Sequence, residues 1–328
     1  MSKLLKSVTI LFAICWLLLT CHASEPTEVK RPPLKVACAI FVGNAPAIIA
    51  QKKGFFKAQG IDVELSYVKY SQLQRADFSA GKYDGIGGSL GGFISLSATN
   101  PDMQTVMVVD ESIGADVVVA QSHIRTVADL KGQNLGVSLG GFSEIFVAEM
   151  LKTANLTSDD VNLVKFDAVE VAKGLKINTI QAGHTWEPHL SEALKLGGHI
   201  LFSSKQTPGL ILDVLTFRGE AIRERPEDIR AFIRGWLQAL NYWEANVKEG
   251  NAIISKELNF STTQLSIDGI NLTNLEENKK FFESNSSHSI YKTAKKNAEF
   301  FIRSGNITRL PELKTLFNSS FLYSPNLP

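Results

Sequence analysis

Short apolar runs alternate with amphipathic stretches from Leu34 onward, and this alternation decides the fold class. Short apolar runs bounded by turn residues predict buried strands, and longer amphipathic stretches predict helices. In the first part of the chain we expect strands at 34–41, 61–68, 83–88 and 103–110, with helices at 44–60, 71–81 and 89–99. A repeated strand–helix order favours a mostly parallel sheet covered by helices, so this part predicts one α/β lobe.

A second series of the same kind follows and is about as long as the first. It predicts strands at 134–139, 162–166, 180–186 and 199–204, with helices at 143–156, 169–178 and 188–197. Two segments of strand character bound this series, ADVVVA at 115–120 and LDVLTFR at 212–218. We expect these segments to cross between two lobes.

The last third of the chain predicts helices and no strand of its own. These helices are expected at 226–247, 251–259, 275–282 and 290–303. We therefore expect the first part of lobe 1 at 34–115, lobe 2 at 116–213, and a return to lobe 1 with the C-terminal helices at 214–328. Roughly 300 residues exceed what one hydrophobic core usually serves, and two lobes with two connections leave a cleft between them.

The N-terminal segment has the pattern of an export signal. Lys3 and Lys6 precede an apolar run from Val8 to Leu19, which is short for a membrane-spanning helix, so residues 1–23 predict a signal peptide. Cleavage near Ala23 releases a soluble protein, whereas a lipobox interpretation places a lipid on Cys21. Thr20 is unusual before a lipidated cysteine and favours the soluble form. Residues 24–33 are polar, contain proline and predict a tether, so we expect a periplasmic protein.

Charge and cysteine usage exclude several classes of protein. The formal net charge of +1 provides no basic field for nucleic acid. Of the three cysteines, Cys15 and Cys21 belong to the export signal or its edge, which leaves Cys38 alone in the mature chain. An internal disulfide is therefore impossible without Cys21. We expect a monomer without a cofactor.

Two glycine-rich stretches follow predicted strands. Gly87-Gly88-Ser89-Leu90-Gly91 matches the G-x-S-x-G pattern of serine hydrolases, with Asp213 and His288 as candidate acid and base. Because no His-Gly-Gly-type oxyanion loop precedes it, we favour a binding role in which Ser89 and nearby amides donate hydrogen bonds to a ligand. The stretch 138–144 is the corresponding feature of lobe 2, where Ser138 and Ser143 begin a helix. Its alternative interpretation is a plain helix cap by Ser143.

Acidic residues gather at predicted strand ends. Buried carboxylates are costly unless they meet a cation or hydrogen-bond donors. We expect Glu111 and Asp116 to pair structurally with arginine or lysine of the other lobe, and Glu187 and Asp213 to face a ligand. Trp186, beside Glu187, is placed to stack on a flat or cationic group of that ligand. Asp110, the remaining member of this set, is left open between the two roles.

One cluster has the residue types of a metal site. His184, Glu187 and His189 lie within HTWEPHL. Pro188 predicts the start of a helix, so His184 lies in the preceding strand, on the face opposite Glu187, while His189 lies in the first turn of the helix. One face cannot present all three side chains, and we expect no metal.

Five segments, in order, resemble one family of bacterial receptors. APAIIAQKKGFFKAQGIDVEL, DESIGADVVVA, VADLKGQNLGV, GHTWEPHLSEAL and TPGLILDVLTFR are similar to the nitrate/sulfonate/taurine group of solute-binding proteins of ABC transporters, which includes receptors for thiamine-pyrimidine precursors. The resemblance runs from about Lys35 to Phe301. It implies the two-lobed α/β periplasmic binding protein fold of type II, which closes on a small ligand and delivers it to an ABC permease in the inner membrane.

The resemblance also places the first strand's end at the pocket edge. It implies pocket roles for Phe41 and Asn44, with a position in the core as the alternative for Phe41, and we expect Leu90 and Phe142 at the ligand as well. The ligand expected is small, organic and nitrogen-containing, either sulfonate-like or pyrimidine-like. A sensory co-receptor of the same fold, signalling to a membrane kinase or cyclase, is the alternative, and a serine hydrolase using Ser89 is a distant one.

Overall fold

The computed structural model describes residues 31–259, 261, 265–323 and 327. The predicted signal peptide, Cys21 and residues 24–30 of the predicted tether lie outside these residues. Both sheets described below belong to the unit Pro33–Pro328. No helix among the described residues is long and apolar enough to cross a membrane.

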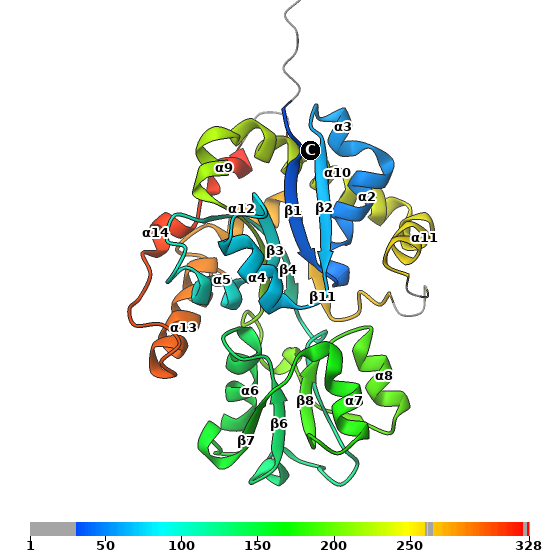
Figure 1. The fold of residues 1–328 in the computed structure, drawn as a ribbon, viewed down its shortest axis with the longest axis vertical. Coiled ribbons are helices and arrows are strands. Elements are labelled where there is room, and N and C mark those ends of the chain that lie inside the picture. The colour runs from blue at the N-terminus through cyan, green and yellow to red at the C-terminus, as the bar shows by residue number, and fades with distance from the viewer. Residues whose placement is uncertain (1–30, 260, 262–264, 324–326, 328) are drawn as a thin grey trace, which may run out of the picture. The chain divides into compact units, whose positions relative to one another are not determined.

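The first sheet has six strands in the order β11-β4-β10-β3-β1-β2 (Figure 1). Their bounds are β1 Leu34–Ala39, β2 Val63–Val68, β3 Gly85–Ser89, β4 Gln104–Ser112, β10 Leu212–Phe217 and β11 Ile270–Leu272. β1 is parallel to β2 and β3, whereas β10 is antiparallel to both β3 and β4. The strand that returns from the second series thus lies in the middle of the first sheet. We call this sheet and its covering helices lobe 1.

The second sheet has five strands in the order β7-β6-β8-β5-β9. Their bounds are β5 Val117–Ala120, β6 Asn134–Val137, β7 Asn162–Lys165, β8 Ala182–Thr185 and β9 His199–Ser203. β6 is parallel to β7 and β8, and β5 runs antiparallel between β8 and β9. This sheet and its helices α6 (Phe142–Lys152), α7 (Val171–Lys176) and α8 (His189–Lys195) are lobe 2. The two lobes confirm the predicted fold class.

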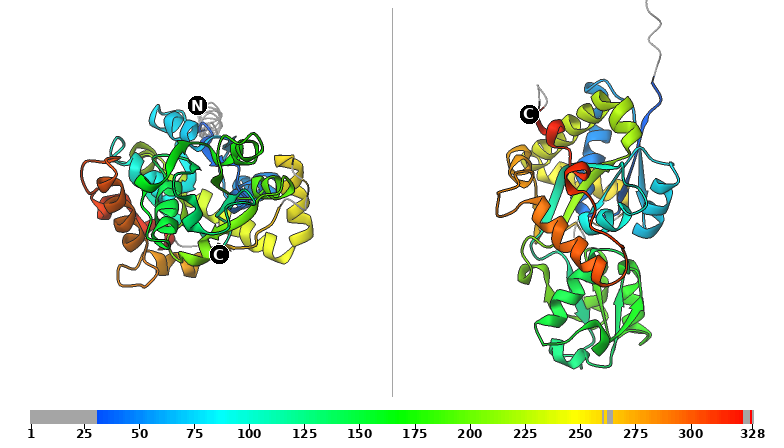
Figure 2. Two further views of the ribbon diagram at one scale, coloured as in Figure 1. Left: turned by 90° about the horizontal axis from the view of Figure 1, so that it is seen from below. Right: turned by 90° about the vertical axis from the view of Figure 1, so that its left-hand side faces the viewer.

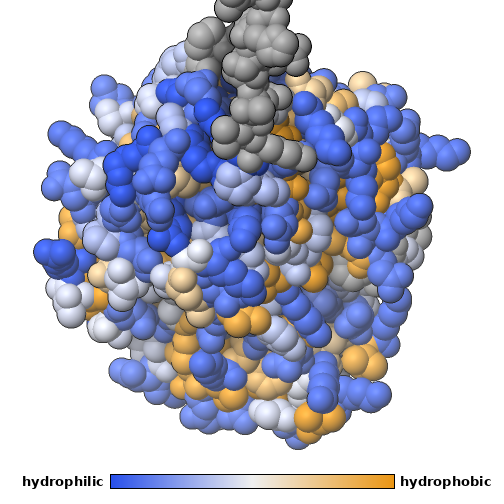
Figure 3. All heavy atoms as spheres, turned by 45° about the horizontal axis from the view of Figure 1, so that its top comes forward, coloured by the Kyte–Doolittle hydropathy of each residue, from blue (hydrophilic) through white to orange (hydrophobic). Residues whose placement is uncertain are grey.

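Helices cover both sheets, and the longest buries its apolar face on lobe 1. The helices are α2 Ala45–Lys53, α3 Phe55–Ala58, α4 Ser71–Ser79, α5 Leu90–Leu96, α6 Phe142–Lys152, α7 Val171–Lys176, α8 His189–Lys195, α9 Gly219–Glu224, α10 Pro226–Ala245, α11 Val247–Leu258, α12 Leu275–Phe281, α13 Ile290–Arg303 and α14 Leu313–Leu316. In α10, Phe232 stacks on Phe56 of α3 with ring centroids 4.7 Å apart, and Trp236 is fully buried. On the face drawn in Figure 3, hydrophilic residues cover the upper part and apolar residues gather lower down.

Three local predictions were wrong. The C-terminal third contains a strand, β11, which pairs with β4 and forms the edge of the first sheet. The helix expected at 44–60 is interrupted at Gly54, whose φ of 76° is left-handed and ends α2 before α3 begins. The segments 115–120 and 212–218 contain strands of the two sheets rather than free crossings, so the chain crosses at 113–116 and 204–211.

The crossing segments are held together, and the lobes touch on one side. Ser204 Oγ lies 2.8 Å from Ser112 Oγ and accepts a hydrogen bond from the Gly114 amide at 2.6 Å. On the side of α13, Lys296 lies 3.6 Å from the Glu149 carboxylate of α6, and Figure 2 shows this orange helix beside lobe 2. A Cβ atom on Gly91 of α5 would lie 3.0 Å from the backbone of Phe142, so the two helices are in direct contact.

Candidate ligand-binding site

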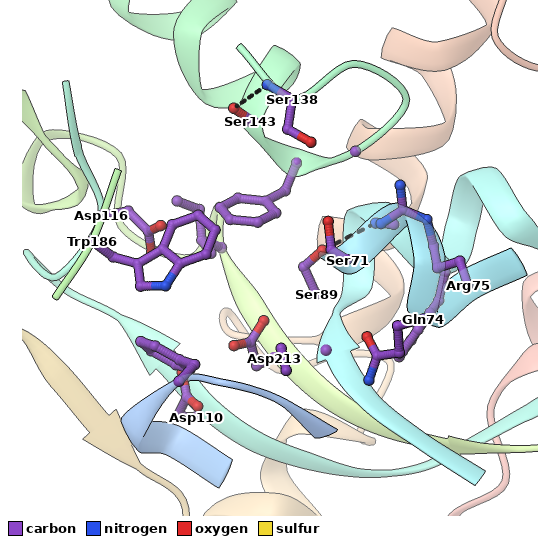
Figure 4. A pocket seen from close by; sticks show the side chains of 18 residues that line it. Ser71, Gln74, Arg75, Ser89, Asp110, Asp116, Ser138, Ser143, Trp186 and Asp213 are labelled. Atoms are coloured by element: carbon purple, nitrogen blue, oxygen red, sulfur yellow. Dashed lines mark hydrogen bonds between the residues drawn. The ribbon is translucent and has the colours of Figure 1, made fainter. Parts of the chain in front are cut away.

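A cavity of about 60 Å³ lies between the lobes (Figure 4). Strand ends, helix starts and the crossing segments supply its wall. The lining residues are Ala39, Phe41, Ser71, Gln74, Arg75, Gly88, Ser89, Gly92, Phe93, Asp110, Asp116, Ser138, Gly141, Phe142, Ser143, Trp186, Ile211 and Asp213. A volume of this size holds roughly five waters, which fits a ligand of about half a dozen heavy atoms.

Three polar residues form a row across the centre of the first sheet. In the antiparallel register, Asp213 of β10 is opposite Ser89 of β3 on one side and opposite Asp110 of β4 on the other. Residues directly opposite each other in a sheet place their side chains on the same face, about 5 Å apart at Cβ. The row therefore turns two carboxylates toward the cavity side by side, an arrangement that destabilises a sheet when both are charged.

Both carboxylates of this row are hard to ionise. Burial, followed by the charges of Asp213, Asp116 and Glu111, holds the pKa of Asp110 well above its usual range. Burial and then the nearby Asp116 raise the pKa of Asp213 to about 7. Asp110 Oδ2 is buried and has no hydrogen-bond partner among the described residues. This oxygen occupies the position that the Cβ atom of any other residue at 43 would take. Glycine at position 43 therefore makes room for the Asp110 carboxylate.

Arg75 brings a positive charge to the cavity from α4. This helix is fixed to the sheet by Gln74, whose amide donates to the carbonyl oxygens of Ala37 and Gly87 at 2.8 and 3.0 Å. Within the described part of the chain, the Arg75 guanidinium has neither a hydrogen bond nor a close ion pair. Burial lowers its pKa, while the charge of Asp167 in lobe 2 acts in the opposite direction. A half-buried guanidinium without a close partner is suited to an anionic ligand group.

A chain of hydrogen bonds lies behind the lobe 2 wall. His184 Nε2 lies 3.0 Å from Asp116 Oδ1, and His184 Nδ1 lies 2.9 Å from Ser143 Oγ. Ser143 Oγ in turn accepts a hydrogen bond from the Ser138 amide at 3.3 Å. His184 is 1 % exposed, so it acts on the cavity through the two residues that it holds rather than by direct contact.

Aromatic rings form the wall beside this chain. The Phe142 ring packs edge-on against the His184 ring, with ring centroids 5.2 Å apart. The centroids of the Trp186 and Phe142 rings are 6.1 Å apart. The indole Nε1 of Trp186 is buried without a hydrogen-bond partner in the described structure. Figure 4 shows Arg75 across the cavity from Trp186 and Asp116, with Asp110 and Asp213 on the side opposite Ser138 and Ser143.

The structure brings most of the sequence-predicted site residues to this cavity. Those in its lining are Phe41, Ser89, Ser138, Phe142, Ser143, Trp186 and Asp213. Leu90 instead belongs to the hydrophobic core, and Asn44 is buried with its amide donating to the Ala39 carbonyl. The Glu187 carboxylate also lies outside the lining, because it accepts hydrogen bonds from the backbone and hydroxyl of Ser191 in α8.

Two other acidic residues have structural partners, but these are not the arginine or lysine of the other lobe that was expected. Glu111 accepts a hydrogen bond from the Gly209 amide at 2.8 Å, and Asp116 pairs with His184. Asp116 nevertheless also lines the cavity. Sequence reasoning missed Arg75, which is one of two charged residues in the α4 sequence SQLQRADFS and has no local signal for a cavity. It also missed the support that His184 gives to Ser143.

The arrangement required for the hydrolase alternative is not formed. Ser89 caps α5 by accepting a hydrogen bond from the Gly92 amide at 3.3 Å. His288 is exposed, pairs with Ser287 and lies outside the cavity lining, so it cannot act as a base for Ser89. Among the described residues there is also no group of three His, Cys, Asp or Glu side chains that could hold a metal ion.

The sequence profile of the NMT1/THI5-like family matches residues 43–249. The chain belongs to this family. A putative binding protein of Brucella abortus is 26% identical over 250 residues, which are 73% of this chain and 76% of the relative. A putative aliphatic sulfonates-binding protein of Bacillus subtilis is 23% identical over 330 residues and covers 97% of this chain and 96% of its own length.

Solved structures share the fold of this NMT1/THI5-like chain. The alkanesulfonate-binding protein SsuA of Xanthomonas axonopodis pv. citri, bound to MOPS, superimposes with a TM-score of 0.72 at 12% identity, covering 88% of this chain and 99% of its own. The desulfurization enzyme DszB superimposes with a TM-score of 0.66 at 16% identity, covering 89% and 98%. The two-lobed fold therefore supports both binding and catalysis, and the chemistry of the cavity must decide between them.

Proposed function

We propose that this NMT1/THI5-like protein is the periplasmic solute receptor of an ABC importer, and that it captures a small organic anion by closing its lobes. The observation that carries this proposal is the unpaired Arg75 guanidinium in an interlobe cavity. Hydroxyl groups of Ser71 and Ser89 in lobe 1 and of Ser138 and Ser143 in lobe 2 line the same cavity. A sulfonate or carboxylate offers three or two acceptor oxygens to such donors. The sulfonate-binding relative and the SsuA fold support the same ligand class.

Contacts from both lobes explain how a ligand would hold the closed form. Arg75 comes from α4 of lobe 1, whereas Ser138, Ser143 and Trp186 come from lobe 2. A ligand that touches both walls has full affinity only when the lobes meet, so binding shifts the population toward closure. The closed pair of lobes is the form that we expect an inner-membrane permease to recognise. We further propose that the receptor is a monomer, is soluble after cleavage near Ala23, and binds no nucleic acid.

We assign the cavity to binding rather than to a reaction. Asp116, His184 and Ser143 are hydrogen-bonded in sequence, as in a hydrolase, but the Ser143 side chain is itself 2 % exposed and its oxygen already accepts a hydrogen bond from the Ser138 amide. This geometry supports a role for the Ser143 hydroxyl as a ligand contact. It leaves the oxygen poorly placed for attack on a substrate.

Isothermal titration calorimetry with ethanesulfonate, isethionate, taurine and nitrate tests the proposal. We expect at least one sulfonate to bind with a dissociation constant in the micromolar range or tighter. Arg75→Gln removes the cation from the cavity and should weaken that binding about 30-fold or more. Arg303→Gln, an exposed arginine of α13, is the matched control and should leave binding unchanged. Equal affinities of the Arg75→Gln and wild-type proteins would show that the anion binds elsewhere.

A further inference from the structure

The wall of the proposed anion site contains two opposed acidic side chains, Asp110 and Asp213. We propose that Asp213 contacts the bound anion in its protonated form, as a hydrogen-bond donor, so that the receptor takes up a proton when it binds its ligand above neutral pH. The proton comes from solvent and stays on the carboxyl group, and no covalent bond of the ligand changes. This inference rests on the proposed function and adds one specific contact and a pH dependence to the same site.

The register of the first sheet places Asp213 in the middle of the polar row. Ser89 lies opposite it on one side and Asp110 on the other, so the three side chains leave the same face of the sheet. Figure 4 shows the Asp213 carboxyl directed toward the middle of the cavity. Ser89 Oγ accepts a hydrogen bond from the Gly92 amide at 3.3 Å, which leaves its own hydroxyl hydrogen for a ligand. In a cavity of about 60 Å³, an anion held by Ser89 and Arg75 therefore also meets Asp213.

The surroundings of the two carboxyl groups favour their neutral form. No lysine or arginine forms an ion pair with Asp110 or Asp213 within the described residues, and Asp110 Oδ2 is buried there without a hydrogen-bond partner. Two opposed carboxylates with little solvation cannot both be ionised, so the empty pair holds a proton. The groups that face the pair from the neighbouring elements are Ser89 on β3, Glu111 on β4, Leu272 on β11, Phe41 and Gly43 after β1, Asp116 ahead of β5 with His184 behind it, and Arg75 on α4.

Protonation decides whether Asp213 repels an anion or binds it. An ionised carboxylate only accepts hydrogen bonds, as a sulfonate does, so the two would meet as like charges without a donor between them. A protonated carboxyl is neutral and offers an O–H donor to the ligand. Burial and the nearby Asp116 raise the pKa of Asp213 to about 7 in the empty site. The charge of a bound anion raises this pKa further, so the complex keeps the proton at pH values at which the empty site has lost it.

Calorimetry of ethanesulfonate and nitrate binding to the wild-type protein between pH 5.5 and pH 9 tests this inference. Both anions stay ionised throughout this range, so a pH dependence belongs to the protein. We expect the dissociation constant to be nearly constant below pH 6 and to rise about 30-fold from pH 6 to pH 8.5. Binding at pH 8.5 should take up about one proton, and binding at pH 6 almost none. The uptake is measured as the dependence of the binding heat on the ionisation enthalpy of the buffer, in buffers without a sulfonate group.

The Asp213→Asn variant separates this role from a structural one. The asparagine amide is a neutral donor at every pH, so this variant should bind the anion about 30-fold more tightly than the wild-type protein at pH 8.5 and about equally at pH 6, without proton uptake. If the carboxyl group were needed only for structure, its replacement would instead weaken binding at both pH values. Glu111→Gln is the matched control and should keep the wild-type profile, because the Glu111 carboxylate accepts a hydrogen bond from the Gly209 amide and lies outside the cavity lining.

The possible results distinguish the two proposals. If the anion binds with the same affinity at pH 6 and pH 8.5, or if proton uptake persists in Asp213→Asn, the role of Asp213 is wrong and the anion receptor stands. If Arg75→Gln binds as tightly as the wild-type protein while Asp213→Asn loses the proton uptake, the Arg75 site is wrong and the role of Asp213 stands. If neither ethanesulfonate nor nitrate binds at any pH in this range, both proposals are overturned.

Discussion

Replacing Asp213 by asparagine should stabilise the empty protein at neutral pH. The pKa of this carboxyl is raised from 3.8 in the unfolded chain to about 7 in the folded one, chiefly by burial. The folded state therefore binds more protons than the unfolded state between about pH 4 and pH 7, so the wild-type protein loses stability as the pH rises through this window. Asparagine is uncharged at every pH and removes this loss.

The size of the effect follows from the shift and from the exposure of the side chain. About three pKa units correspond to about 4 kcal/mol for a fully dry group, at about 1.4 kcal/mol per unit. Asp213 is half-buried and faces a cavity that solvent enters, so we expect screening to leave about 2 kcal/mol. For a chain of this length that is a rise in Tm of about 4 °C relative to the wild-type protein.

Differential scanning calorimetry from pH 4 to pH 8 checks this prediction. The difference in Tm between the Asp213→Asn and wild-type proteins should be near zero at pH 4, grow up to about pH 7 and then stay constant. Asp268→Asn, which removes an exposed carboxylate, is the matched control. A difference that is constant over the whole range, or that shrinks as the pH rises, would refute the view that Asp213 retains a proton in the empty cavity.

Two substitutions and one labelling experiment test the structure around the site. Gly91→Val places methyl groups against the Phe142 backbone and should hold the lobes apart. We expect sulfonate binding, measured by calorimetry, to weaken about tenfold. Unchanged affinity would mean that the contact is not needed for closure. His184→Phe leaves the buried Asp116 carboxylate without its partner. The free energy of unfolding, measured in guanidinium, should fall by about 3 kcal/mol. A loss well below about 1 kcal/mol would contradict the role given to this pair. Burial raises the pKa of Cys38 to about 12, so a thiol reagent at pH 8 should label it only after unfolding, and rapid labelling of the folded protein would show that this strand opens.

The fold could be predicted because its signals are local. Each strand of the βα series is an apolar run bounded by turn residues, and each helix has its own amphipathic pattern, so the order of elements along the chain is visible in short windows. The strand β11 lacked such a signal, since its three residues are extended only because they pair with β4. Gly54 was a signal for the break in the first helix, but the helical periodicity on both sides of it favoured one continuous helix.

The site could be predicted only where it depends on nearby residues. Ser89 and Ser143 lie at the starts of helices, a position that the local sequence indicates directly. Glu187 was assigned to the pocket for its place next to Trp186, but adjacent residues at a strand end point different ways, and its carboxylate bonds to Ser191. Arg75 reaches the cavity because α4 docks on β1 and β3 through Gln74, which no short window of sequence contains.

The carboxylate pair depends on register, and its position links its protonation to the two connections between the lobes. Asp110 lies near the end of β4, just before the chain crosses at 113–116, and Asp213 lies near the start of β10, just after it returns at 204–211. Loss of the proton that this pair holds would therefore set two like charges against each other on the two strands that carry the connections between the lobes.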